Sequence, residues 1–109
     1  MKSFLIIVLS FLSVAVYAQK ASTSTFAVSG NCSLCKKHIE KAVAVDGVAK
    51  ASWNQKTQKM TVVYDPSRIN VDAIQQKIAA AGYDTEKYRS DDKAYKALDE
   101  CCQYERKKG

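Results

Sequence analysis

Apolar residues recur along the chain with two alternating spacings, and these spacings predict its strands and helices. Residues 23–29 and 59–64 set apolar side chains at every second position among polar ones, a pattern typical of half-buried strands. Residues 35–45 and 71–81 repeat apolar positions every three or four residues, as a helix with one buried face does. In chain order we expect a strand at 23–29, a helix at 35–45, strands at 48–53 and 59–64, a helix at 71–81, a strand at 83–88 and a helix at 91–101.

The order of these elements predicts the fold class. A split βαβ order indicates an α+β, ferredoxin-like βαββαβ sandwich, with a four-stranded antiparallel sheet and two helices on one face. Here a C-terminal helix follows, so we expect one domain at residues 19–89 and a helical tail at 90–109 with a charged, frayed end. The tail helix is expected to lie on the face of the sheet that the other helices leave bare.

The first eighteen residues have the composition of a secretory signal peptide. Lys2 precedes an apolar run from residue 4 to 16, and Val16-Tyr17-Ala18 fits a small-residue cleavage site. The run is shorter than the roughly 20 residues that a membrane-spanning helix needs. We therefore expect cleavage near Ala18, export to the periplasm or the medium, and a mature form that does not span the membrane.

The charge and the residue types exclude several classes of function. The chain has 17 Lys and Arg against 11 Asp and Glu, a net charge of +6, but the two signs are interleaved and no nucleic-acid-binding motif accompanies them. The sequence also shows no Ser-His-Asp set, no paired carboxylates of a cleft and no phosphate-binding Gly loop. We expect neither an enzyme nor a nucleic-acid-binding protein.

Four cysteines are the candidates for chemistry. Cys32 and Cys35 form a CxxC motif, and Cys101 and Cys102 are adjacent near the other end. In an exported protein cysteines often pair, and four of them allow three disulfide connectivities. One interpretation is therefore a disulfide-stapled or thiol-redox module that holds no metal, and the other is a metal site.

The position of the CxxC motif favours the metal site. The motif lies where a loop becomes a helix, and the free N–H groups and positive dipole of a helix start favour thiolate, the form that binds metal. Soft sulfur ligands select Cu(I) and similar ions, whereas a closed structural zinc site needs four ligands. We therefore predict an open site at Cys32 and Cys35 for a soft ion, with Cu(I) first and Hg(II) second.

The same residues resemble the heavy-metal-associated domain family, which includes copper chaperones, the cytoplasmic arms of copper-pumping ATPases and periplasmic mercury-binding proteins. The resemblance covers about residues 23–88 and implies that Cys32 and Cys35 bind a soft metal ion, with Tyr83 beside the site as a non-ligand. This chain lacks the buried Met that the family usually places before the motif. The resemblance rests on Gly30-x-Cys32-x-x-Cys35, Ile39-Glu40-Lys41-Ala42, Gly47-Val48, Tyr64-Asp65-Pro66 and Ala81-Gly82-Tyr83.

The tail cysteines add three alternatives. Cys101 and Cys102 are expected to return close to the CxxC loop, where they are additional thiolate ligands, disulfide partners or an inert pair. Two additional thiolates would also suit Zn(II) or Cd(II). His38, the one histidine, is expected to face solvent from its helix.

Together these features predict a metallochaperone or scavenger. It would pass its ion by thiolate exchange to a metal-transporting membrane protein or to another thiol carrier. A monomer is expected, although an open CxxC site also allows a metal-bridged dimer.

Overall fold

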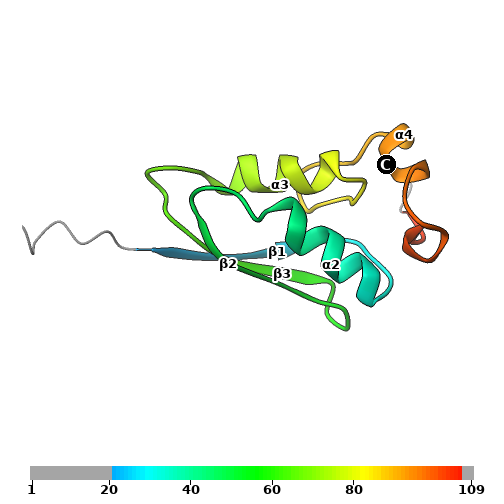
Figure 1. Cartoon of the computed structure of the whole chain (residues 1–109), viewed down its shortest axis with the longest axis horizontal. Helices are drawn as coiled ribbons and strands as arrows, with labels where there is room; N and C mark the ends of the chain where they lie inside the picture. Colours follow the sequence, from blue (N-terminus) through cyan, green and yellow to red (C-terminus); the bar gives the residue numbers. More distant parts are fainter. Residues whose placement is uncertain (1–20, 107–109) are drawn as a thin grey trace, which may run out of the picture.

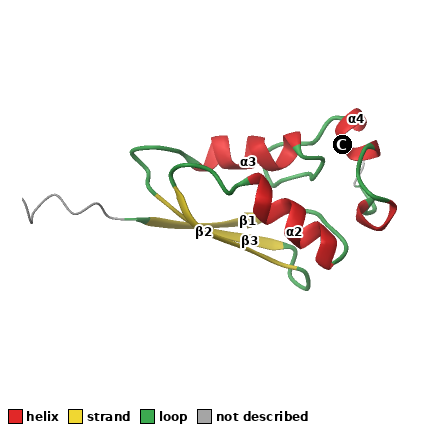
Figure 2. Cartoon of the chain, viewed as in Figure 1, coloured by secondary structure: helices red, strands yellow, loops and turns green. Residues whose placement is uncertain are grey.

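A computed structural model describes residues 21–106 as a sheet with two helices on one of its faces (Figure 1; Figure 2). The alternation of strands and helices predicted from the sequence is confirmed as far as the second long helix. The predicted signal peptide lies outside the described residues. The elements are β1 (Ser22–Ala27), α2 (Ser33–Ala42), β2 (Val48–Asn54), β3 (Lys59–Tyr64), α3 (Val71–Ala80), α4 (Asp92–Lys96) and the 3₁₀ helix η2 (Glu100–Cys102).

The sheet is antiparallel, with β3 between β1 and β2. Met60 in β3 lies opposite Phe26 in β1 and opposite Trp53 in β2, and all three side chains are buried. Strand side chains alternate between the two faces, so these residues point together toward the helices. The helices contribute Ile39, Val43, Ile74 and Ile78 to the same core.

The predicted fourth strand at 83–88 is not formed. In the described chain this segment makes one isolated antiparallel bridge, between Thr85 and Val28 at the edge beyond β1. The ladder stops because Thr85 turns the chain back: its N–H donates to the carbonyl of Tyr88 at 2.7 Å and its Oγ1 accepts the N–H of Tyr88 at 2.9 Å. The Thr85 hydroxyl thus accepts a backbone N–H, that of Tyr88, which a strand would need for its ladder. Within the described residues the sheet therefore has three strands.

The predicted single helix at 91–101 is also corrected. Asp91 begins α4 by accepting the N–H of Ala94 at 2.7 Å, but α4 buries no residue and ends at Lys96. The side-chain amide of Gln103 then donates to the carbonyl of Leu98 at 3.2 Å, which holds the turn before η2. Figure 1 shows this tail beyond the ends of α2 and α3, not on the bare face of the sheet.

Gly82 allows the tail to approach the end of α3. Its φ is +110°, and a Cβ at this position would lie 2.8 Å from Cδ2 of Leu98 and 2.9 Å from the carbonyl oxygen of Ala94. Only glycine adopts this backbone conformation and leaves this space without strain. The loop after α3 and the tail are therefore in direct contact.

Trp53 supports the loop that carries the cysteines. The indole is 1% exposed, and its Nε1–H donates to the carbonyl of Val28 at 2.9 Å. A Cβ on Gly30 would lie 2.9 Å from the indole edge, so the ring fills the space beneath Gly30. Trp53 thus occupies the space under the loop that a side chain at residue 30 would otherwise need.

Replacing Trp53 should loosen this loop and destabilise the domain. In Trp53→Phe the carbonyl of Val28 loses its donor inside the core, which costs about 1–3 kcal/mol of unfolding free energy. Urea unfolding followed by circular dichroism measures the loss. Tyr64→Phe is the matched control, because no hydrogen bond of the Tyr64 hydroxyl is found within residues 21–106, and it should change stability by less than about 0.5 kcal/mol. Equal stability of Trp53→Phe and wild type would contradict the role given to the indole.

Candidate metal centre

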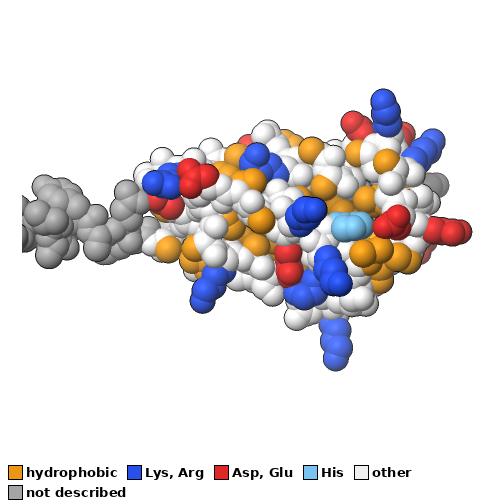
Figure 3. Space-filling model, in the orientation of Figure 1, with side chains coloured by type: hydrophobic (Ala, Val, Ile, Leu, Met, Phe, Trp, Pro, Cys, Tyr) orange, Lys and Arg blue, Asp and Glu red, His pale blue; other side chains and the backbone are white. Residues whose placement is uncertain are grey.

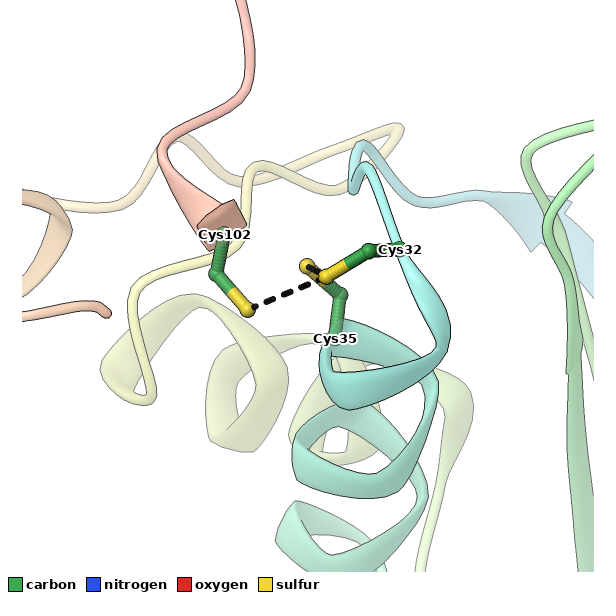
Figure 4. Close-up of side chains that lie close together, drawn as sticks. All are labelled: Cys32, Cys35 and Cys102. Atoms are coloured by element: carbon green, nitrogen blue, oxygen red, sulfur yellow. Dashed lines mark hydrogen bonds between the residues drawn. The ribbon is translucent and has the colours of Figure 1, made fainter. Parts of the chain in front are cut away.

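The CxxC motif places two sulfurs together at the start of α2. Cys32 is the N-cap residue, with an extended backbone, and Cys35 lies in the first turn. Their Sγ atoms are 3.4 Å apart (Figure 4). Cys35 is fully buried, whereas Cys32 is partly exposed. One sulfur therefore faces the core and the other opens toward the surface.

The tail brings both of its cysteines to this pair. Sγ of Cys102 lies 3.8 Å from Sγ of Cys32, and Sγ of Cys101 lies 3.4 Å from it. Cys102 is fully buried and Cys101 is exposed. The sulfurs of Cys32, Cys35 and Cys102 all lie within 4.8 Å of one another, and Figure 4 shows them converging from α2 and the tail. All four cysteines are free thiols.

Tyr83 lies beside the thiols of Cys102 and Cys35. Its side chain is fully buried, and its hydroxyl lies 3.0 Å from Nδ1 of His38. Burial and then a hydrogen bond donated to Cys102 raise the pKa of Tyr83, so the hydroxyl stays protonated as a donor. His38 is half-buried against this hydroxyl and does not simply face solvent, which corrects the sequence-based expectation.

The Cys32 thiol ionises more readily than an ordinary cysteine. Desolvation tends to raise its pKa, but a hydrogen bond from the backbone N–H of Cys35 and hydrogen bonds with the thiols of Cys101, Cys35 and Cys102 together outweigh it. The pKa of Cys32 is lowered to about 7 from the usual 9.0. A large share of Cys32 is therefore thiolate at neutral pH, which is the form that binds metal.

The pKa values of the two tail thiols, Cys101 and Cys102, are shifted upward, opposite to that of Cys32. Burial, followed by a hydrogen bond to Cys35, raises the pKa of Cys102. A hydrogen bond to Cys32, followed by desolvation, raises the pKa of Cys101. Thiols held this close together cannot all carry charge, because each new thiolate faces the ones already formed. In the absence of a cation both tail cysteines are therefore held protonated beside the Cys32 thiolate.

The spacing of the sulfurs suits one soft ion. A metal about 2.3 Å from each of three sulfurs in a plane holds them roughly 4 Å apart. The observed separations of 3.4 and 3.8 Å from Cys32 to Cys35 and Cys102 are close to that value. An ion would also replace the thiol protons and remove the repulsion between thiolates.

The charge of Lys36, the residue that follows the CxxC motif, is directed away from the sulfurs. Lys36 pairs with Glu40 and donates to the carbonyl of Trp53 at 3.0 Å. Glu40 also accepts the N–H of Trp53 at 2.9 Å and so joins α2 to β2. On the face in Figure 3, basic side chains are scattered among acidic ones and form no single patch.

Sequence reasoning missed the residues that hold the tail at the site. Tyr104 and Arg106 were assigned to a frayed end, yet Tyr104 is 2% exposed and the Arg106 side chain is 10% exposed. The sequence did contain a signal that this end is packed against the domain: an aromatic residue and an arginine stand in an otherwise hydrophilic stretch. Both residue types are favoured at packed contacts.

An α+β domain with an open group of thiols at the start of its first helix defines a class of soft-metal-binding modules. The chain belongs to one family of that class: the heavy-metal-associated domain model matches residues 25–84. The match covers both cysteines of the CxxC motif and ends before the tail, so Cys101 and Cys102 lie outside it.

Curated relatives and solved structures agree with this membership. The chain is 41% identical over 56 residues to a copper-exporting P-type ATPase of Staphylococcus saprophyticus, half of this chain but only 7% of that protein. It is 43% identical over 54 residues to a zinc-transporting ATPase of Synechocystis, covering 49% of this chain and 8% of that protein. The chain thus spans less than a tenth of each.

Two smaller proteins are matched over nearly their whole length. The structure of a CopZ metallochaperone is 33% identical, with a TM-score of 0.57, and the match covers 59% of this chain and 98% of CopZ. The structure of oxidised MerP from Ralstonia metallidurans is 31% identical, also with a TM-score of 0.57, and the match covers 61% and 94% of the two chains.

None of the helices described between residues 21 and 106 has the length and hydropathy to cross a bilayer.

Cys32 should react with alkylating reagents at a pH where the tail thiols do not. Its alkylation rate is expected to rise with pH through a midpoint near 7, because its pKa is lowered to about 7 and the thiolate is the nucleophile. Peptide mass spectrometry of the reduced protein after short iodoacetamide pulses measures each site. Exposed Cys101 is the internal control and should react only at higher pH. Equal alkylation rates at Cys32 and Cys101 near pH 7 would contradict the lowered pKa of Cys32.

Proposed function

We propose that this protein binds and transfers a soft metal ion through Cys32 and Cys35, with Cu(I) as the favoured cargo and Hg(II) next. One observation carries the proposal: the two sulfurs lie 3.4 Å apart at a helix start, with one of them at the surface. Two thiolates and a monovalent ion leave a net charge of −1, which the helix start offsets. Membership of the heavy-metal-associated family and the copper-transporting relatives support this choice.

Transfer proceeds by thiolate exchange. A thiolate of the receiving protein forms a bond to the ion as one bond to Cys32 or Cys35 breaks. The incoming thiol gives up a proton and the departing thiolate takes one up, so charge and protons balance. The receiver is a metal-transporting membrane protein or another thiol carrier, and partly exposed Cys32 is the sulfur that it can reach.

Export fits the same role. The apolar run at residues 4–16 and the small residues that end at Ala18 support cleavage there and release to the periplasm or the medium. In that compartment the protein would meet the ion before or after its passage through the membrane.

The reduced protein should compete for Cu(I) against a calibrated Cu(I) chelator, whereas Cys32→Ser and Cys35→Ser should each lose this ability. Each variant removes one of two soft ligands, so the apparent affinity is expected to fall at least about a hundredfold, the upper end of what loss of an outer ligand contact costs. Ser33→Ala is the matched control, because it changes the same loop without removing sulfur. Reduced wild-type protein that binds no more copper than the control reaction would overturn the proposal.

Intact mass distinguishes this function from a disulfide-stapled or thiol-redox module. We expect free thiols and one bound ion per chain in protein isolated from its native compartment under anaerobic conditions. A gain of about four daltons on reduction, with no metal released, would correspond to two disulfides and would support the thiol-redox alternative. The measurement compares native mass before reduction, after reduction and after chelation.

The exported form should begin at Gln19. Expression of the full chain in a bacterial host, followed by intact-mass analysis of the periplasmic fraction, tests the cleavage site. Val16→Asp breaks the apolar run and the small-residue motif and should leave uncleaved protein in the cell. A mature protein that retains Met1 in the periplasmic fraction would contradict cleavage.

A further inference from the structure

The C-terminal segment, residues 90–106, is attached to the domain by a charge pair of low exposure. Arg106 contacts the carboxylate of Asp84 through two nitrogens, with Nη2–Oδ1 at 2.8 Å and Nε–Oδ2 at 3.1 Å. Its Nη1 also lies 2.9 Å from a carboxylate oxygen of Asp92. The Arg106 and Asp84 side chains are 10% and 15% exposed. Bidentate pairs of an arginine with a carboxylate are strong and directional, so this pair fixes the orientation of the C-terminal segment on the domain.

Tyr104 provides a second attachment. Its hydroxyl donates to the carbonyl of Gly82 at 2.9 Å and accepts the N–H of Asp84 at 2.8 Å. Its ring stacks on Tyr83 with the centroids 6.0 Å apart, and Tyr95 packs edge-on against it at 5.0 Å. A buried aromatic with a satisfied hydroxyl is typical of a permanent contact. The segment is therefore part of the folded domain.

Cys102 lies two residues before Tyr104 in this attached segment. Its N–H donates to the carbonyl of Asp99 at 2.8 Å within η2, and its side chain is fully buried. A buried cysteine among apolar side chains alone would be an inert core residue. Cys102 instead faces the sulfurs of Cys32 and Cys35, all within 4.8 Å of one another.

We propose that Cys102 is a third sulfur ligand of the ion that Cys32 and Cys35 bind, carried to the site by the C-terminal segment. The proposal rests on the proposed function, because it adds a ligand to the same site. Its consequence is a three-sulfur site in place of the open pair that the CxxC motif alone supplies. Exposed Cys101 stays outside this group of three, at the mouth of the site, 3.4 Å from Cys32.

X-ray absorption of the reduced full-length protein loaded with one equivalent of Cu(I) tests the proposal. We expect three Cu–S bonds in wild type and two shorter bonds in Cys102→Ser. The same variant should bind Cu(I) at least about tenfold more weakly, since even an outer ligand contact is worth that much. Cys101→Ser is the matched control and should keep three bonds, because it removes the neighbouring sulfur that is outside the group.

A second variant separates loss of the sulfur from loss of its position. Arg106→Ala keeps all four cysteines but removes the contact with Asp84, so it should also lower the Cu–S count and the affinity. Lys93→Ala removes an exposed charge from the same segment and should behave as wild type. Circular dichroism of both variants verifies that α2 and α3 remain folded.

Three bonds in wild type that become two in Cys102→Ser support the proposal. Two bonds in wild type, or an unchanged count and affinity in Cys102→Ser, overturn it and leave Cys32 and Cys35 as the complete site. Wild-type protein that binds no Cu(I) refutes the proposed function itself, so the two failures are distinguishable.

Discussion

The arrangement of the sulfurs depends on one buried phenol. The hydroxyl of Tyr83 lies 3.0 Å from Nδ1 of His38 on α2, burial and then the thiol of Cys102 raise the pKa of this hydroxyl, and the ring stacks on Tyr104. A buried hydroxyl must keep its partners, because losing them leaves a polar group unsatisfied in the core. Tyr83 therefore requires the start of α2, the loop after α3 and the tail to keep the positions in which their sulfurs meet. A residue outside the group of sulfurs thus helps to set how many of them meet.

This geometry also creates an electrostatic problem that a metal ion solves. Several thiols within about 4 Å of one another cannot all ionise, and Cys32 takes the charge while the tail thiols stay protonated. A soft cation at the centre reverses the preference of each thiol, because every sulfur then faces positive charge instead of another thiolate. The free site is therefore poised for an ion, with the Cys32 thiolate ready to make the first bond and the protonated Cys102 thiol able to follow.

The sequence predicted the parts of this site that depend on local pattern. The alternation of Phe26 and Val28 and the helical stripe through Ile39 are repeated along short stretches, so they identified β1 and α2 and placed the CxxC motif between them. The rest depends on contacts between distant residues. Thr85 belongs to a strand-like stretch, but its hydroxyl captures the N–H of Tyr88 and ends the ladder. The end of the chain reads as a charged tail until Asp84 is seen 2.8 Å from Arg106.

The attachment of the tail gives the chain a way to change how tightly it holds an ion. If an ion binds better when the C-terminal segment is attached, then by linkage attachment is also stronger when the ion is bound, and by the same factor. Loss of the contact between Arg106 and Asp84 would make release to a receiving thiol easier, because two sulfurs would remain where three had been. Cys101 and Cys102 are adjacent, so movement of one short helix shifts both sulfurs at once. A contact between Asp84 and Arg106, both far beyond the CxxC motif in the sequence, can thus set the difference between storing an ion and passing it on, without any change in Cys32 or Cys35.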